Sequence, residues 1–180
     1  MHPIQVNEDI NLKPIVLSDA KIIFHIIQSQ RAYLRKWLPF VDNTRHVVDT
    51  ENYINSIYAT PPDQRERVFT IHYKNAFAGL IGLKSIDKQN QKTEIGYWLS
   101  ESFQKKGIMS LSVKALIDYA FQQLQLNRIQ IKCAVGNNES KHIPQRLGFT
   151  FEGIEREGEL LSDNIFTDLE VYSILKKDLG

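Results

Sequence analysis

The chain has 180 residues, 42% of them hydrophobic, and its 22 lysines and arginines nearly balance 21 aspartates and glutamates, which leaves a formal charge of +1. This length supports one core without requiring two, so we expect a single domain over residues 1–180. The balanced charge argues against a nucleic-acid-binding surface, and any anion site must therefore be local.

Cysteine content and hydropathy bound the cellular setting. Cys133 is the only cysteine, so no intramolecular disulfide can form, and the first residues lack the charged-then-apolar segment of a secretion signal. We therefore expect a cytoplasmic protein. No apolar run approaches the roughly 20 residues of a membrane-spanning helix, and the five histidines lack metal-ligand spacing, so neither a membrane nor a metal is expected.

Periodicity and turn residues predict the elements of the N-terminal half. A first strand covers residues 4–15, and Ser18 and Asp19 can cap a helix that ends near Gln30. The remaining elements are a helical patch over 33–38, a helix over 51–59, and three strands over 68–73, 77–86 and 93–99. Because short turns join these three strands, they should form an antiparallel meander.

The C-terminal half begins with a long amphipathic helix. Apolar residues recur at helical spacing from Ile108 to Leu124, and residues 128–135 then alternate as in a strand, which predicts a parallel strand pair with a right-handed crossover. The last elements are a short helix from Asn137–Asn138 to Gly148 and strands near 149–160 and 166–175. Pro144 would disturb the short helix unless it lay in the first turn. The sum is an α/β (α+β) fold: one mixed, mostly antiparallel sheet of about seven strands with helices on both faces.

The turn before the long helix, Gln104-Lys105-Lys106-Gly107-Ile108-Met109, is suited to a phosphate. A glycine at a helix start lets the backbone approach an anion, and the free N–H groups of the first turn favour negative charge. Lys105 and Lys106 would add charge-assisted contacts. The turn matches neither the mononucleotide nor the dinucleotide glycine pattern, so another phosphate-bearing cofactor is indicated. The alternative is a solvated basic loop.

This order of elements, with the Gln104–Gly107 turn, the Asn137–Ser140 turn and the segment Arg146-Leu147-Gly148-Phe149, resembles the GNAT superfamily of acetyl-CoA-dependent N-acetyltransferases over roughly residues 10–176. The superfamily signature is Gln or Arg, two residues, Gly, one residue, then Gly or Ala; only Met109 departs from it. Gly107-Ile108-Met109-Ser110 is similar to the RimL-like branch, the ribosomal-protein serine N-acetyltransferases, where that replacement is normal. Tyr33-Leu34 to Trp37-Leu38 and Ile131-Lys132-Cys133 also resemble this branch.

The resemblance implies that acetyl-CoA is the cosubstrate. Its pantetheine arm would lie where the strands 93–99 and 128–135 splay apart, and its pyrophosphate on the amides of Gln104 to Gly107 and Met109. The implied cofactor-binding residues are Gln104, Lys105, Lys106, Gly107, Ile108, Met109, Cys133 and Asn138.

The resemblance also implies catalytic roles. Glu159 would accept the amine proton through water, Ser140 would protonate the departing thiolate, and Cys133 would lie beside the CoA sulfur. Each has a structural alternative, because Glu159 could end an exposed strand, Ser140 could finish a helical turn, and a buried cysteine is more often core than reactive. Glu94 is a second candidate base that faces either the cleft or solvent. Asn138 can be a helix cap, a pantetheine ligand or both.

The acceptor implied by the resemblance is the N-terminal α-amine of a ribosomal protein. An α-amine, with a pKa of about 7.7 to 8.0, is easier to deprotonate than a lysine near 10.4. No nucleophile-elbow motif is present, so direct attack by the amine is expected. The alternatives are a small amine such as a polyamine or an antibiotic, and a non-catalytic CoA-binding module. Relatives of this branch also suggest a homodimer.

Overall fold

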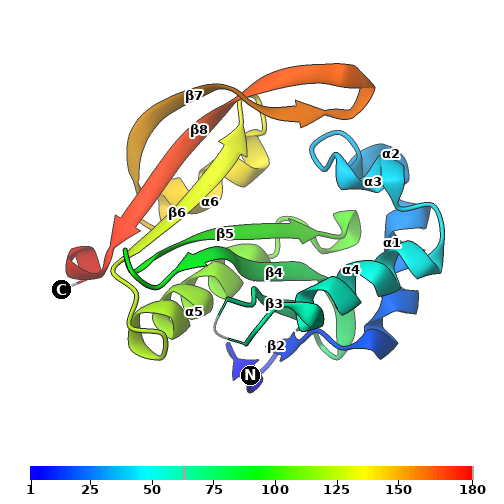
Figure 1. Ribbon diagram of the computed structural model, residues 1–180, viewed down its shortest axis with the longest axis horizontal. Helices are drawn as coiled ribbons and strands as arrows, with labels where there is room; N and C mark the ends of the chain where they lie inside the picture. Colours follow the sequence, from blue (N-terminus) through cyan, green and yellow to red (C-terminus); the bar gives the residue numbers. More distant parts are fainter. Residues whose placement is uncertain (63, 180) are drawn as a thin grey trace.

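The computed structural model describes residues 1–62 and 64–179 (Figure 1). Its strands form one sheet in the order β1-β2-β3-β4-β5-β6-β8-β7, in which only the β5–β6 pair is parallel. The strands are β1 Ile4–Gln5, β2 Ile10–Pro14, β3 Arg67–Tyr73, β4 Ala76–Asp87, β5 Lys92–Leu99, β6 Arg128–Ala134, β7 Thr150–Leu161 and β8 Ile165–Leu175. The predicted mixed, mostly antiparallel sheet is confirmed.

The single strand predicted over residues 4–15 is observed as two strands, β1 and β2, which brings the total to eight. Asn7 breaks that segment, because its side-chain Oδ1 accepts hydrogen bonds from the backbone N–H groups of Asp9 (3.0 Å) and Ile10 (2.7 Å). This is an Asx turn, which reverses the chain and pairs β1 with β2. The prediction of about seven strands therefore missed the two-residue strand β1.

The helices are α1 Ala20–Ser29, α2 Arg31–Leu34, α3 Phe40–Asn43, α4 Val47–Ala59, α5 Ile108–Gln122 and α6 Asn138–Arg146. Helix α4 begins four residues before its predicted start at residue 51. The Asp49 carboxylate accepts the backbone N–H groups of His46 (2.8 Å) and Arg45 (2.9 Å) and so stabilises an earlier helix start. The predicted patch over 33–38 is only partly helical, because α2 ends at Leu34.

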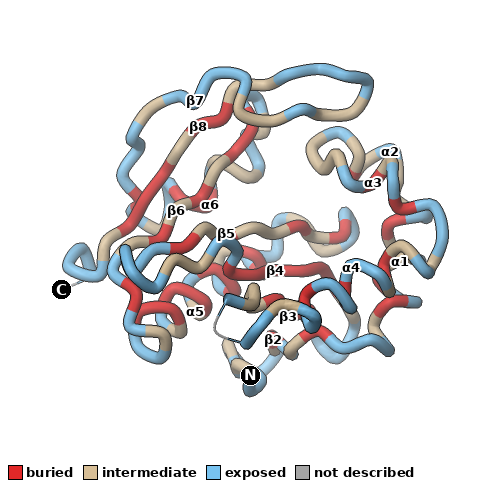
Figure 2. Tube along the Cα trace, viewed as in Figure 1, coloured by how far each residue is buried: buried red, intermediate tan, exposed pale blue. Residues whose placement is uncertain are grey.

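Helices cover both faces of the sheet, as predicted, and each face has its own core (Figure 2). On one face α5 packs on β2–β6 through residues such as Val113, Leu116, Phe69 and Ile131. On the other face α1 and α4 pack on β3–β5 around Ile54, Val68, Leu80 and Trp98. Alternate residues of β5 therefore point to opposite layers.

The parallel strands β5 and β6 pair over only a short stretch. Lys92, Thr93 and Glu94 lie opposite Arg128, Ile129 and Gln130, and beyond them both strands continue without pairing to each other. Figure 1 shows them diverging, with α6 on the β6 side of the gap. The predicted splay is confirmed, and it leaves unpaired strand backbone and a wedge-shaped opening between the two halves of the sheet.

Candidate active site

The turn that begins α5 has the backbone geometry of an anion site. Gly107 has a φ of 72° and Lys105 a φ of 59°, so the chain turns sharply before the helix. Within the described chain, the amides of Lys105, Lys106 and Gly107 donate to no backbone carbonyl, and the first turn of α5 adds further free N–H groups. These groups and the helix dipole favour a bound anion.

The backbone amide of Gln104, which was predicted to bind pyrophosphate, is not free in the structure. Its backbone N–H donates to the carbonyl of Glu101 (3.1 Å), so that amide is already used. Its side-chain amide donates to the Tyr33 hydroxyl, which joins the turn to α2. The remaining amides of the predicted set are available to a ligand.

A first cavity, of about 380 Å³, opens beside this turn. It extends from the turn between β5 and α6, and its charged lining is mostly basic: Lys105, Lys106 and Arg146, against Glu139. Ile108 and Met109 also line it, although both are largely buried. A basic mouth, free amides and an apolar floor fit a ligand with a phosphate end and a less polar arm.

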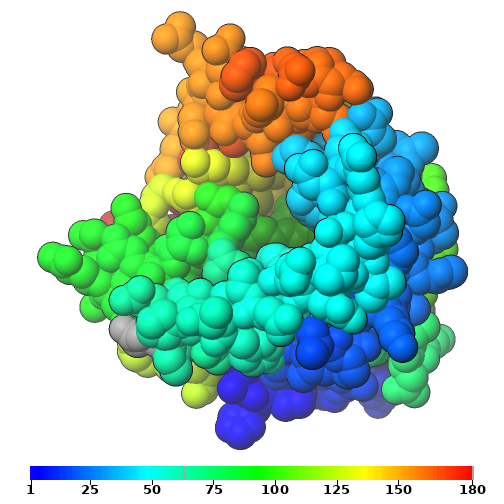
Figure 3. Space-filling view, turned by 45° about the vertical axis from the view of Figure 1, so that its right-hand side comes forward, coloured from blue at the N-terminus to red at the C-terminus, as the bar shows by residue number. Residues whose placement is uncertain are grey.

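A second cavity, of about 560 Å³, lies on the other side of β5. Figure 3 shows the hollow, bordered by the β7–β8 hairpin (orange), the α2–α4 region (cyan) and the β4–β5 strands (green). Its charged lining is mostly acidic, with Asp49, Glu66, Glu94 and Glu159 against Lys84 and Lys132. Six residues line both cavities: Trp37, Leu38, Tyr97, Trp98, Asn137 and Ser140. The two cavities therefore meet where β5 and β6 diverge.

Tyr97 and Ser140 are bonded to each other at this meeting point. The Ser140 hydroxyl donates to the Tyr97 hydroxyl oxygen (3.1 Å), and the Tyr97 hydroxyl donates to the Ser140 carbonyl (3.2 Å). The Cys133 sulfur lies 3.3 Å from the Ser140 Oγ, and because the Ser140 proton goes to Tyr97, the thiol is the donor. One ordered chain of donors thus crosses from β6 through α6 to β5.

Pro144 explains why the Ser140 carbonyl is available. A helical residue at 144 would donate its N–H to the carbonyl four residues earlier, but proline has none. Helix α6 nevertheless continues through Pro144, because the Tyr97 hydroxyl satisfies that carbonyl from another strand. The expected disturbance of the helix is therefore absent, although Pro144 lies beyond the first turn.

The thiol and the phenol at this point are neutral near neutral pH. Burial raises the pKa of Cys133 above its usual value, and burial likewise raises the pKa of Tyr97. The Cys133 residue is 2% exposed and packs with Ile129 and Ile131, which confirms its place in the core while its sulfur contacts the site. The raised pKa of the thiol disfavours the thiolate that a cysteine nucleophile requires.

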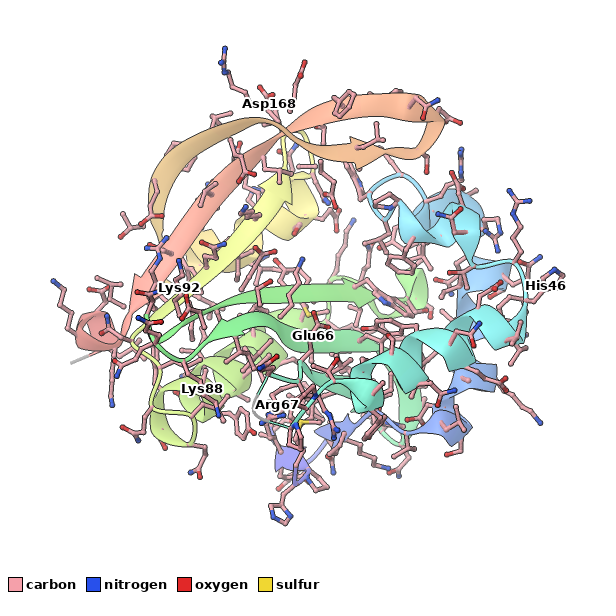
Figure 4. The ribbon with its side chains drawn as sticks, in the orientation of Figure 1. His46, Glu66, Arg67, Lys88, Lys92 and Asp168 are labelled. Carbon is pink, nitrogen blue, oxygen red and sulfur yellow. The ribbon has the colours of Figure 1, made fainter. Side chains whose placement is uncertain are left out.

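Glu159 lines the second cavity, and its carboxylate forms no hydrogen bond or ion pair with a described residue, although its backbone pairs with Thr167. Burial raises the pKa of its carboxyl above the usual value; Lys84 partly opposes this shift, and Glu94 adds to it. Residues 156–158 of β7 bulge out of register opposite Asp168, whose Oδ1 accepts the Glu157 N–H (2.8 Å). Figure 4 labels Asp168 where β7 crosses β8. The structure therefore supplies a half-buried, unpaired carboxylate whose pKa lies above its usual value.

Glu94 faces the same cavity rather than solvent, with its side chain 16% exposed. Its carboxylate pairs with the Lys84 Nζ (2.8 Å) and accepts a hydrogen bond from the Gln130 side chain (3.0 Å). Both contacts occupy the Glu94 carboxylate, whereas no described side chain contacts the carboxylate of Glu159 in this way. Of the two predicted candidates, Glu159 is the better placed.

One predicted site residue, Asn138, lies away from both cavities. Asn138 is exposed and is absent from the lining of both cavities, whereas its neighbour Asn137 lines both and caps α6 by accepting the Ser140 N–H (3.3 Å). Tyr97, Asn137 and Glu66 were not predicted as site residues. The sequence predicted only that Tyr97 lies on one face of a strand. Pro144 was the available signal, because a proline there leaves the Ser140 carbonyl free to accept a hydrogen bond from another element.

Comparison with known proteins agrees with this geometry. The family model described as "Acetyltransferase (GNAT) domain" matches residues 9–150. The chain therefore belongs to the acetyltransferase (GNAT) domain family. It is 35% identical to the Bacillus subtilis protein named "Putative ribosomal N-acetyltransferase YdaF", over 99% of this chain and 97% of that protein. It is 29% identical to an Escherichia coli ribosomal-protein-serine acetyltransferase, over 94% of each chain.

One solved structure with the same fold contains coenzyme A. The RimL ribosomal-protein alpha-N-acetyltransferase, solved with coenzyme A in a disulfide with one of its cysteines, superimposes with a TM-score of 0.91 at 26% identity, over 96% of this chain and 97% of that one. As a member of the GNAT family, the protein described by this sequence uses acetyl-CoA. The described residues contain no group of three or more His, Cys, Asp or Glu side chains that could hold a metal ion. None of the described helices is long and apolar enough to cross a membrane.

The Tyr97–Ser140 contact yields a direct prediction. Tyr97→Phe removes both hydrogen bonds and leaves the Ser140 carbonyl unpaired, so the free energy of unfolding should fall by about 1–3 kcal/mol. Turnover should fall about tenfold or more. Acetyl-CoA binding should weaken less than turnover, because Tyr97 lines the first cavity but the α5 turn is untouched.

The matched control is Tyr119→Phe, since the Tyr119 hydroxyl has no hydrogen bond to a described residue. Thermal unfolding, calorimetry with acetyl-CoA and thiol release measure the three quantities. Equal effects of the two substitutions on turnover would contradict the assigned role of the Tyr97 hydroxyl.

Proposed function

We propose that this acetyltransferase transfers the acetyl group to the N-terminal α-amine of a ribosomal protein by direct attack of the amine. The observation that carries the proposal is the meeting of a basic cavity and an acidic cavity at Tyr97 and Ser140. The basic cavity suits a nucleotide cosubstrate, and the acidic cavity is open to the N-terminal end of an acceptor protein. The similarity to enzymes named for ribosomal-protein acetylation supports this acceptor.

The cofactor-side part of the proposal uses the α5 turn. The amides of Lys105, Lys106, Gly107 and Met109 would bind the pyrophosphate, with the two lysine side chains adding charge. Ile108 and Met109 would form the apolar floor, and the Gln104 side chain would hold α2 against the turn. The pantetheine arm would use the unpaired backbone of β5 and β6. Asn137, rather than the exposed Asn138, is the asparagine placed to contact it.

The proposed chemistry assigns one proton to each of two residues. Glu159 accepts the proton of the attacking amine through a water molecule, because its carboxylate lines the acceptor cavity and no described side chain pairs with it. Ser140 donates a proton to the departing thiolate and regains one from water, which balances the proton that Glu159 has taken from the amine. The Tyr97 hydroxyl is the hydrogen-bond partner of the Ser140 oxygen throughout. Cys133 lies beside the CoA sulfur as a packing residue, and Glu94 holds Lys84 rather than acting as the base.

A pH profile tests the role of Glu159. Since the carboxylate must be ionised to accept a proton and burial raises its pKa, kcat should fall as the pH decreases through that raised pKa. Glu159→Gln should lower kcat by about 10²–10⁴ and remove this acid limb. Glu94→Gln serves as the control. An acid limb that persists in Glu159→Gln and disappears in Glu94→Gln would reverse the assignment.

The acceptor is tested by thiol release with three amines. A peptide with a free N-terminal serine should be acetylated, and the same peptide with a blocked N-terminus should not, because only the α-amine is the proposed nucleophile. Spermidine is the third acceptor, since the acidic lining of the second cavity favours a small cationic amine as the second candidate function. Turnover with spermidine alone would contradict the peptide assignment. Acetyl-CoA binding without turnover of any amine would favour a non-catalytic module.

The proposal also includes one domain over residues 1–180, a cytoplasmic location and a homodimer. The β7–β8 hairpin ends the sheet and carries exposed apolar side chains, among them Ile154, Ile165 and Phe166, which supports an interface there. Sedimentation velocity would show a monomer if this expectation is wrong.

A further inference from the structure

The second cavity holds more negative charge than its own residues neutralise. Its two lysines are already engaged, Lys84 with Glu94 (2.8 Å) and Lys132 with Glu155 (2.6 Å). Asp49 is committed to the start of α4 through two backbone N–H groups. Glu66 and Glu159 are left, and neither carboxylate forms a hydrogen bond or ion pair with a described residue. Since Glu159 serves the reacting amine, Glu66 has no assigned role.

Glu66 lies in a partly desolvated place. It precedes β3, lines the second cavity, and is labelled near the centre of the view in Figure 4. Burial raises the pKa of its carboxyl above the usual value, with Lys84 partly opposing the shift. Tyr53 is 42% exposed as a residue, but desolvation of its hydroxyl and the charge of Glu66 raise the pKa of that hydroxyl to about 12. Glu66 and Tyr53 line the same cavity, and a cation bound there would relieve the cost of an unpaired carboxylate.

Thr50 provides an independent sign of a missing ligand. It lines the same cavity, is 3% exposed, and its Oγ1 has no hydrogen-bond partner among the described residues. Thr50 and Tyr53 are three residues apart on α4, so their side chains are neighbours on one face of the helix. A carboxylate, an unpaired hydroxyl and an aromatic ring therefore line the same cavity. These are the groups that bind an ammonium ion.

We propose that Glu66, Thr50 and Tyr53 form a subsite for a second positive charge on the acceptor, an ammonium or guanidinium group separate from the amine that is acetylated. This inference rests on the proposed function, because it assumes that the second cavity receives the acceptor. It assigns the substrate class as amines that carry a second cation.

The sheet register sets the spacing between the two charges. Phe69 of β3 pairs with Ile81 of β4, and Ile81 pairs with Tyr97 of β5. Tyr97 therefore lies directly across the sheet from Phe69, two strands away. Glu66 is three residues along from Phe69. At about 3.3 Å per residue and about 4.8 Å per strand, the two backbone positions are about 14 Å apart. Because the side chains reach inward, the second cation should lie on the order of 10 Å from the reacting nitrogen, or about three residues along an extended peptide.

The test compares two six-residue peptides that begin with serine and differ only at the third position, lysine in one and norleucine in the other. The wild-type enzyme should favour the lysine peptide in kcat/KM by about tenfold or more, mainly through KM. Glu66→Gln should reduce this preference to near onefold and leave the norleucine peptide unaffected. Asp118→Asn, which removes an exposed charge from α5, is the matched control and should keep the preference.

Equal turnover of the two peptides by the wild-type enzyme, or a preference that survives Glu66→Gln, would overturn the subsite while leaving the proposed function standing. Spermidine binding, measured by calorimetry, is a readout that needs no turnover. If no peptide is acetylated but spermidine binding is lost in Glu66→Gln and kept in Asp118→Asn, the subsite is supported and the peptide acceptor is not. Spermidine binding that is unchanged by Glu66→Gln would overturn the subsite.

Discussion

The divergence of β5 and β6 after three parallel pairs is the constraint on which the rest of the structure depends. Two strands that stop pairing leave their backbone groups unsatisfied and open a gap through the sheet. The gap is bridged by side chains, since Tyr97 of β5 bonds twice to Ser140 of α6. Pro144 makes this bridge possible by removing the N–H that would otherwise occupy the Ser140 carbonyl. Both cavities of the acetyltransferase open onto this bridge.

Most of the fold was predictable from the sequence, because its signals are local. The apolar spacing from Ile108 to Leu124 and the alternation over 128–135 specify a helix and a strand whatever the surroundings. Differences arose where a single side chain acts on nearby backbone. Asn7 split the predicted first strand, and Asp49 moved the start of α4 to Val47. Such capping and turn bonds depend on side-chain rotamers, which periodicity does not report.

The site was predictable only in part, for a physical reason. The α5 turn is one contiguous segment, so glycine, lysines and helix start appear together in the sequence. The acceptor side is assembled from α4, β4, β5, β6 and β7, and its behaviour depends on which charges pair. Glu94 and Glu159 look alike in sequence, yet Lys84 holds one and leaves the other free. Packing between distant segments likewise leaves the Glu66 carboxylate without a partner. It also places Asn137, rather than Asn138, in the lining of the cavities.

The most direct test of the account is a crystal structure with a bisubstrate analogue in which CoA is joined through its sulfur to the N-terminus of a serine-starting peptide. The account predicts the pyrophosphate on the amides that follow Gln104, the sulfur beside Ser140 and Cys133, and the peptide in the cavity lined by Glu159 and Glu66. A pyrophosphate bound away from the α5 turn, or a peptide that leaves on the same side of β5 as the nucleotide, would contradict it.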